Sequence, residues 1–220
     1  MNDALWKEIG LGCWQTLYSS VIATALATLI GIPIGVLLAL TDKNGLIQNK
    51  LVNKALGFVV NVLRSVPFLI LFVVVMPFTR AVVGTTIGTV ATIVPLTLCA
   101  APFVARLTET SVKEVDGGVT EAALACGASL RKAVFGAILP EALPSLLCNL
   151  AVTFVTVVGY SAMTGFCGGG GLGAIAVNYG YYRNNRTVMY VAVLFIIIIV
   201  QLFQELGLWL AKRRDKRKKS

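Results

Sequence analysis

The sequence contains no histidine and few charged residues. Only 13% of its 220 residues are charged, against roughly 25% in an average soluble domain. The absence of histidine excludes a Ser-His-Asp triad, a His-ligated zinc or haem, and a histidine proton relay. Hydrophobic residues make up 57% of the chain, and a soluble protein of this size lacks the interior to hide so much apolar surface. The composition therefore indicates an integral membrane protein.

Several chemical sites are missing as well. The sequence has no GxxxxGK[ST] loop for nucleotide phosphates, and none of its five cysteines forms a CxxC pair. The glycine run Gly168–Gly173 fits GxGxxG, but it follows an expected membrane helix rather than a strand. We interpret it as a flexible or tightly packed turn. We therefore expect no cofactor, no metal site and no catalytic residue on this chain.

Apolar runs of roughly 18 or more residues predict membrane helices. We predict an all-α integral membrane protein with one transmembrane domain over 1–220 and five spans. Two GxxxG patterns, beginning at Gly31 and Gly84, permit close helix contact. The spans cover about 13–40, 55–77, 84–107, 146–165 and 187–211.

The distribution of basic residues predicts the orientation. The loop 41–54, the segment 106–145 and the tail 212–220 together carry 14 of the 19 lysines and arginines. The positive-inside rule then places these three segments in the cytoplasm and the N-terminus outside. We interpret the tail as an anchor touching anionic membrane lipid, not as a nucleic-acid-binding segment.

The acidic residues bear on the energy source. All ten lie in loops, tails, the cytoplasmic segment or the end of the fifth span, so none is expected at mid-membrane. A proton- or sodium-coupled transporter normally needs a buried ionisable group or broken helices around the ion. If the chain transports a solute, we expect the energy to enter from another subunit.

The segment 108–145 is the long cytoplasmic connection between the third and fourth spans. Alanine-rich residues after Asp116-Gly117-Gly118 predict a short helix that stops at Gly127. Ser129 is a suitable cap for a second short helix, which we expect to run from Leu130 to Leu139 and to end at Pro140. The prediction is two short helices with a sharp bend at the inner membrane face.

This segment resembles the EAA loop of ABC-importer permeases. The resemblance rests on Glu121-Ala122-Ala123, the glycine four residues later, and Ile138-Leu139-Pro140. It implies a coupling helix that fits into a cleft on a cytoplasmic ATPase. The residues assigned to this docking role are Glu121, Ala122, Ala123, Gly127, Ile138 and Pro140, the last two of which fix the exit toward the fourth span.

The resemblance extends over most of the chain. The segment Asn61–Pro67 resembles the Arg-x-x-Pro segment of amino-acid importer permeases. Three further segments, 93–96, 158–163 and 170–173, resemble methionine-uptake permeases, as does Asn178-Tyr179-Gly180-Tyr181. The family resemblance implies a homodimer of five-span subunits on two ATPase subunits that bind ATP-Mg, with an external substrate-binding (lipo)protein.

A small set of residues is expected near a transport path. Arg64 either lines a water-filled cavity or caps carbonyls beside Pro67. Tyr160, Ser161 and Met163 lie near the outer part of the fourth span, where Met163 from two subunits either closes a pore or packs as an ordinary helix residue. The outer loops 78–83 and 166–186 are short and poor in acids, as expected for a docking face.

The sequence thus predicts a bacterial inner-membrane permease subunit, not an enzyme, that moves methionine (L- and D-) by alternating access. A permease for another amino acid or small metabolite is the alternative within the same class. A membrane scaffold or enzyme is the alternative from a different class, and the lack of convergent polar groups in the bilayer disfavours it.

Overall fold

The structure is a computed structural model that describes residues 3–214. Of the predicted basic tail 212–220, residues 215–220 lie outside the described residues. Within the described residues the chain is helical and contains no strand. The helices are α1 (Asp3–Thr41), α2 (Lys50–Ser65), α3 (Phe68–Val83), α4 (Thr89–Lys113), α5 (Gly117–Ala125), α6 (Leu130–Ala133), α7 (Leu139–Met163), α8 (Leu172–Ile175) and α9 (Arg186–Arg214), with a 3-10 turn at Thr164–Cys167 and π-helical turns at Val134–Ile138 and Ala176–Tyr182.

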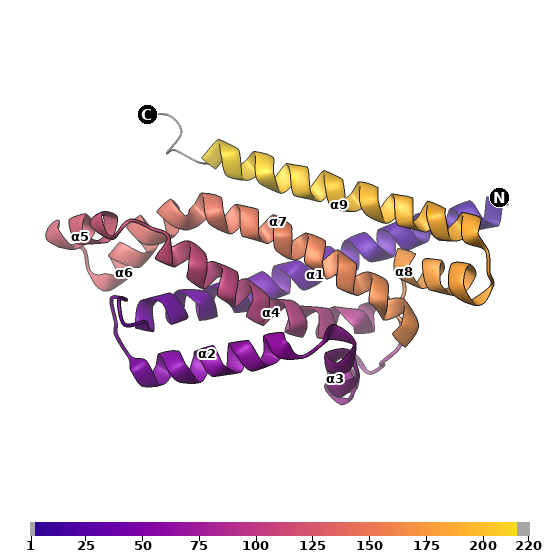
Figure 1. The fold of residues 1–220 in the computed structure, drawn as a ribbon, viewed down its shortest axis with the longest axis horizontal. Helices are drawn as coiled ribbons and strands as arrows, with labels where there is room; N and C mark the ends of the chain where they lie inside the picture. Colours follow the sequence, from indigo (N-terminus) through magenta and orange to yellow (C-terminus); the bar gives the residue numbers. More distant parts are fainter. Residues whose placement is uncertain (1–2, 215–220) are drawn as a thin grey trace.

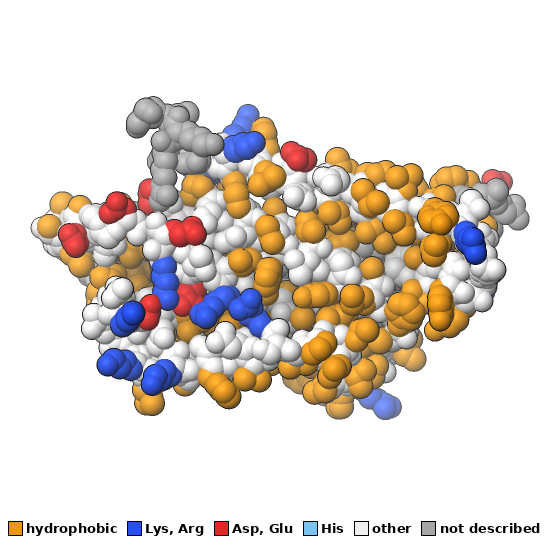
Figure 2. Space-filling model, viewed as in Figure 1, with side chains coloured by type: hydrophobic (Ala, Val, Ile, Leu, Met, Phe, Trp, Pro, Cys, Tyr) orange, Lys and Arg blue, Asp and Glu red, His pale blue; other side chains and the backbone are white. Residues whose placement is uncertain are grey.

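The long helices α1, α4, α7 and α9 run along one axis as a bundle (Figure 1). Helix α1 packs mainly against α4, and α7 packs mainly against α9. Helices α5 and α6 lie at one end, called here the α5 end, while α8 and the beginning of α1 lie at the opposite α8 end. Figure 2 shows most charged side chains of this face toward the α5 end, a few at the opposite end and the edges, and mainly hydrophobic side chains between. This distribution suits a bundle that crosses an apolar layer.

The all-helical membrane architecture expected from the sequence is confirmed, and the number of spans is four or five. Among residues 3–214, four helical stretches are long and apolar enough to cross a membrane. A fifth span results if the bent pair α2 and α3 counts as one. The four stretches are Leu5–Thr41, Thr89–Lys113, Leu130–Cys167 and Arg186–Arg214.

The apolar run predicted as a second span over 55–77 is divided. Helices α2 and α3 meet at an angle of 109°. Pro67 lacks an N–H and disfavours the helical conformation of the residue before it. Val66 is accordingly extended, with φ −80° and ψ 124°. The proline therefore ends one helix and begins another pointing in a different direction.

Pro140 does not end a helix, contrary to the sequence prediction. The chain stays helical from Leu130 through Cys167. Immediately before the proline, the Leu139 N–H bonds to the Val134 carbonyl across the π turn. A wider turn of this kind accommodates a residue that has no N–H and carries a ring. The predicted second short helix is thus the beginning of the long helix that contains α7.

The third predicted span ends later than expected. Helix α4 continues to Lys113 rather than stopping near 107. Glu109, placed by the sequence in the cytoplasmic segment, therefore lies within the helix and is only 5% exposed.

Small residues bring α1 and α4 close together. A Cβ added at Gly31 would lie 2.7 Å from the Ala101 carbonyl oxygen, and one at Gly35 would lie 2.3 Å from that of Ala105. The first GxxxG pattern is thus a close helix contact. The second is not, because Gly84 and Gly88 flank a loop and have open space around them.

The glycine run after the 3-10 turn is tightly packed against α1. The Gln15 side chain accepts a hydrogen bond from the Gly171 N–H at 2.8 Å, and the Thr16 hydroxyl accepts one from the Leu172 N–H at 2.9 Å. A Cβ at Gly170 would lie 2.1 Å from the Thr89 hydroxyl oxygen. The two hydrogen bonds join the segment to α1 across 156 residues of sequence, and the approach of Gly170 to Thr89 places it against the beginning of α4.

A matched pair of substitutions tests the contact between α1 and α4. Alanine at Gly10 has open space and should raise stability slightly through its helix propensity. Gly35→Ala must push α4 away and should destabilise the fold by about 1–3 kcal/mol. Thermal unfolding in detergent should show a lower melting temperature for Gly35→Ala only. Equal melting temperatures would contradict the close packing.

Candidate functional site

Helix α5 projects at the end of the bundle as a short, capped helix (Figure 1). The Asp116 side chain accepts a hydrogen bond from the Gly118 N–H at 2.7 Å, which caps its beginning. At its end Gly127 adopts φ 77°, and the Ala128 N–H donates to the Ala123 carbonyl at 3.1 Å. This left-handed ending is natural for glycine. No residue of α5 is buried, so the helix presents most of its surface for contact with another molecule.

The six predicted docking residues occupy two places. Glu121, Ala122 and Gly127 are exposed on or beside α5, with Ala123 half-buried. Ile138 is buried against Val112 of α4 and Leu40 of α1, and Pro140 is exposed at the start of α7. The first four form the projecting surface, and the last two belong to its base. Ser129 caps α6 as predicted, accepting from the Lys132 N–H.

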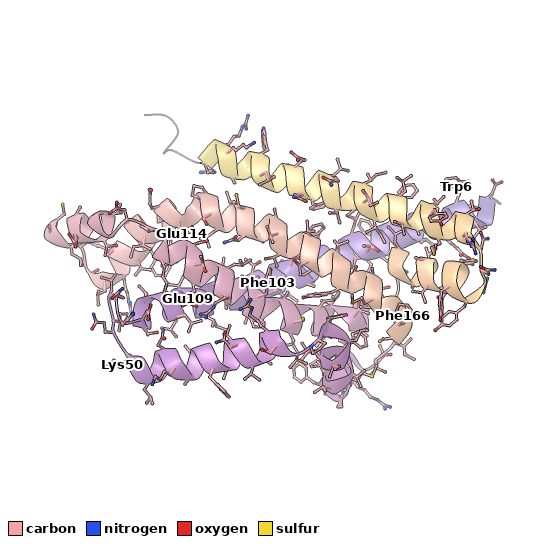
Figure 3. All side chains as sticks on the ribbon, viewed as in Figure 1. Trp6, Lys50, Phe103, Glu109, Glu114 and Phe166 are labelled. Atoms are coloured by element: carbon pink, nitrogen blue, oxygen red, sulfur yellow. The ribbon has the colours of Figure 1, made fainter. Side chains whose placement is uncertain are left out.

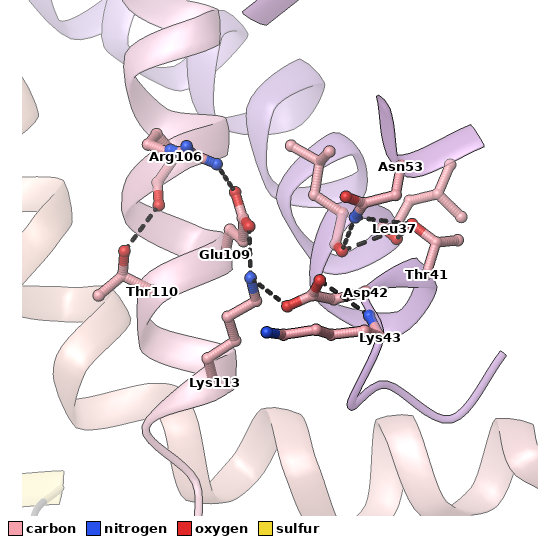
Figure 4. A network of polar contacts seen from close by, with 10 residues as sticks. Leu37, Thr41, Asp42, Lys43, Asn53, Arg106, Glu109, Thr110 and Lys113 are labelled. Carbon is pink, nitrogen blue, oxygen red and sulfur yellow. Dashed lines mark hydrogen bonds and ion pairs between the residues drawn. The ribbon is translucent and has the colours of Figure 1, made fainter. Parts of the chain in front are cut away.

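An ion-pair network joins the base of this segment to α1 (Figure 4). The Lys113 ammonium lies 2.8 Å from the Asp42 carboxylate, in the loop after α1, and 2.7 Å from that of Glu109. Arg106 pairs with the other oxygen of Glu109. The hydrogen bond from Lys113 is the main cause that holds the pKa of Asp42 below its usual range. Lys113 and Arg106 thus compensate the charge of the nearly buried Glu109 carboxylate.

A second polar group joins the same end of α4 to α7. The Asn149 amide donates to the Ser111 hydroxyl at 2.7 Å, and that hydroxyl lies 2.8 Å from the hydroxyl of Ser145. Ser145 donates to the Glu114 carboxylate at 3.3 Å. Glu109 and Glu114 are both labelled at this end of α4 in Figure 3. The segment that carries α5 is therefore tied to both α1 and α7.

Sequence reasoning missed these two networks. In the sequence, Lys113 and Arg106 are charges that indicate orientation and nothing more. The spacing of Arg106, Glu109 and Lys113, three and four residues apart on one helix, is the available signal. No comparable local signal marks Ser111 and Asn149, which are 38 residues apart.

Two predicted path residues lie at the break between α2 and α3, and a third stacks on the residue that follows it. Arg64 and Pro67 are exposed at the break. The next residue, Phe68, stacks on the Tyr160 ring with centroids 4.8 Å apart and an interplanar angle of 6°. The break between α2 and α3 therefore lies directly beside an aromatic contact with α7.

The other two predicted path residues differ in position. Met163 ends α7 and is 45% exposed. Ser161 is buried, and its hydroxyl donates to the Val158 carbonyl of its own helix at 2.8 Å. Ser161 thus faces the protein interior, whereas Met163 presents its thioether at the surface.

The α8 end carries an exposed aromatic surface, here defined as Phe166, Tyr181 and Tyr182. Neighbouring rings contact edge-on, with centroids 6.4 Å and 5.3 Å apart. Phe166 and Trp6 are labelled toward this end in Figure 3. Nearby, a hydrogen bond to Glu8 raises the pKa of Tyr179, and the Arg183 guanidinium lies 4.5 Å from the Tyr179 ring centroid.

Comparisons with known proteins agree on one family. Residues 31–219 match the model of the "binding-protein-dependent transport system inner membrane component" family. A probable D-methionine transport system permease protein from Pasteurella multocida is 46% identical over 99% of this chain and 100% of its own length. Its counterpart from Vibrio cholerae is 50% identical over 93% of this chain and 91% of its own. A chain of the MetNI methionine ABC transporter, solved in inward-facing conformations, superposes with a TM-score of 0.96 at 41% identity, covering 98% of this chain and 100% of that one.

Acid should weaken the base of the α5 segment. Because the pKa of Asp42 is lowered by folding, its ionised form stabilises the folded chain above the ordinary value of 3.8. This contribution is lost as the pH falls through the lower pKa of the folded chain. Asp42→Asn should lower the melting temperature at neutral pH, and its difference from the unaltered chain should close below pH 3.8. In a Lys113→Met background the same substitution should have little effect, and a gap independent of pH would contradict the ion pair.

Proposed function

The chain belongs to the family of binding-protein-dependent transport system inner membrane components, and we propose that it is the membrane-spanning subunit of an ATP-driven methionine importer. The observation that carries this proposal is the exposed, capped helix α5, held on a base tied to three long helices. The printed names of the relatives support methionine as the substrate. Both L- and D-methionine are included in the proposal.

The chain is a permease subunit and not an enzyme. We assign ATP-Mg and its hydrolysis to a separate cytoplasmic ATPase. Helix α5 is a suitable element for docking, because its alanines allow a partner backbone to approach closely and the exposed Glu121 offers a charge for an ion pair. The assembly we propose has two copies of this chain, two ATPase subunits and an external substrate-binding (lipo)protein. The solved MetNI methionine ABC transporter supports an ATPase partner, and the binding-protein-dependent description of the family supports a binding protein.

The contacts around α5 suggest how movement is transmitted. Ile138 and Lys113 join the base of α5 to α1 and α4, while Ser111 and Asn149 join α4 to α7. A displacement of α5 by closing ATPase subunits would therefore move these helices together. We propose alternating access, in which two such bundles rock about a path between them.

We propose that the path passes the break between α2 and α3. Arg64 and Pro67 are exposed there, and Tyr160 stacks on Phe68 behind them. An exposed arginine within an apolar region is costly against lipid, by about 2.5–3.5 kcal/mol at a helix centre. A water-filled space between two copies removes that cost. Met163 lies farther toward the α8 end as a gate, and the hydrogen-bonded Ser161 supports the helix beneath it.

We propose five spans, with α2 and α3 together forming the second. The α5 end faces the cytoplasm, because the basic loop 41–54 and the basic residues Lys212, Arg213 and Arg214 lie at that end. The N-terminus and the aromatic surface then face outward. Exposed aromatic rings suit a docking interface for the external binding protein.

Uptake measurements test the function and its docking site. In cells carrying this chain with its ATPase and binding protein, Glu121→Arg combined with Gly127→Val should abolish uptake of labelled methionine. The first change reverses a charge, and the second places a β-branched residue at φ 77°. Glu205→Arg, on exposed α9, should leave uptake unchanged. Retained uptake and co-purification of the ATPase with the double variant would overturn the docking assignment.

Competition between labelled methionine and unlabelled amino acids identifies the transported substrate. Excess unlabelled L- or D-methionine should suppress the uptake, whereas other amino acids should not. Suppression by a different amino acid alone would replace methionine by that solute and leave the docking assignment standing.

If Met163 is a gate, its removal should uncouple ATP hydrolysis from the binding protein. Met163→Ala removes the exposed thioether and should raise ATPase activity in the absence of binding protein. Met163→Leu keeps an apolar side chain of similar size and should behave like the unaltered chain. Identical basal ATPase activity in all three would show that Met163 only packs.

A further inference from the structure

An apolar groove runs along the surface between α1, α7 and α9. Its volume is about 650 Å³. Small residues of α1, including Ala25 and Thr28, face Leu150 of α7 and Leu206 of α9 across it. Gly207 lies directly against Ala151, since a Cβ added there would come within 2.4 Å of the alanine Cβ. The groove therefore lies beside a place where α7 and α9 are already as close as backbones allow.

The ends of the groove differ chemically. Toward the α8 end lie Phe154 and Phe203, whose rings stack with centroids 4.1 Å apart. Toward the α5 end, the lining face of α9 passes through Leu206 and Leu210. Arg213 and Arg214 follow Leu210 by three and four residues, one further turn along α9. The groove thus lies between an aromatic pair and the basic turn at the end of α9.

Arg213 is held in a defined position. The Arg213 guanidinium lies 4.0 Å from the centroid of the Trp209 ring. Trp209 is 49% exposed, and Lys212 and Arg214 flank the arginine in sequence. An interfacial tryptophan beside basic residues is the arrangement expected where a span meets the headgroup layer.

We propose that this groove holds an acyl chain of an anionic phospholipid whose phosphate is bound at Arg213. The lining stretch of α1 from Val21 to Pro33 is about 18 Å long at 1.5 Å per residue. Half of a ~30 Å hydrocarbon core is ~15 Å. One acyl chain of the leaflet at the α5 end therefore matches the groove in length and polarity.

Charge favours a lipid over a second copy of the chain in this groove. Two-fold pairing through this face would bring two α9 ends together, each carrying Lys212, Arg213 and Arg214. An anionic headgroup instead neutralises this end. The proposal goes beyond the transport function, and its failure would leave the uptake predictions intact.

Quenching of Trp209 by brominated lipids tests the proposal. The full chain, with Trp6 and Trp14 changed to Phe, is placed in nanodiscs containing either brominated phosphatidylglycerol or brominated phosphatidylcholine. Phosphatidylglycerol should reach half-quenching at a lower mole fraction. Arg213→Gln should reduce this preference by about fivefold, the equivalent of ~1 kcal/mol per basic residue at a membrane surface.

A matched pair of groove variants separates this site from general lipid contact. Ala25→Phe fills the groove from α1 and should weaken quenching by phosphatidylglycerol. Ile30→Phe adds a ring to an exposed residue of the same helix outside the groove and should not. If Ala25→Phe does not fold, the exposed Arg213→Gln variant still decides. Equal quenching by both lipids, as expected if a second copy covers the groove, would overturn the proposal.

Discussion

The ion pairs of Lys113 join α4 to the loop after α1 at the α5 end of the bundle. Its ammonium contacts a carboxylate from the loop after α1 and another from its own helix. Glu109 is almost fully buried, so its charge must be compensated there. Removing a partner from a fully buried pair costs about 3–5 kcal/mol, and less is at stake here because the basic partners are about 40% exposed. The position of α5 depends on this pairing, because the segment leaves α4 directly after Lys113.

Much of the fold could be predicted from the sequence, because apolar length and glycine position are local signals. The caps of α5 and α6 are encoded by Asp116, Gly127 and Ser129, and each acts as its residue type suggests. The first GxxxG pattern indicated a real helix contact. The second pattern has the same letters but lies in a loop, since the letters do not show where a helix begins.

Proline shows why the remainder could not be predicted. Pro67 separates two helices by 109°, whereas Pro95, Pro102 and Pro144 lie inside continuous helices. Each removes one N–H, but neighbouring helices and local adjustments of the turn decide whether the chain bends. The candidate site shares this dependence. The Ser111–Asn149 bond and the Phe68–Tyr160 stack join residues that only the tertiary packing brings together.

The number of residues in the π turn at Val134–Ile138 determines the direction in which α5 points. A helix turns by about 100° per residue, and a π turn holds one residue more than an α turn. The five residues of this turn therefore set the rotational phase of α6, and with it α5, relative to α7. A chain with one residue fewer here would keep the same residues on α5 but aim them at a different side of the bundle. The length of this segment is thus part of the information that directs α5, alongside the identity of the residues on its surface.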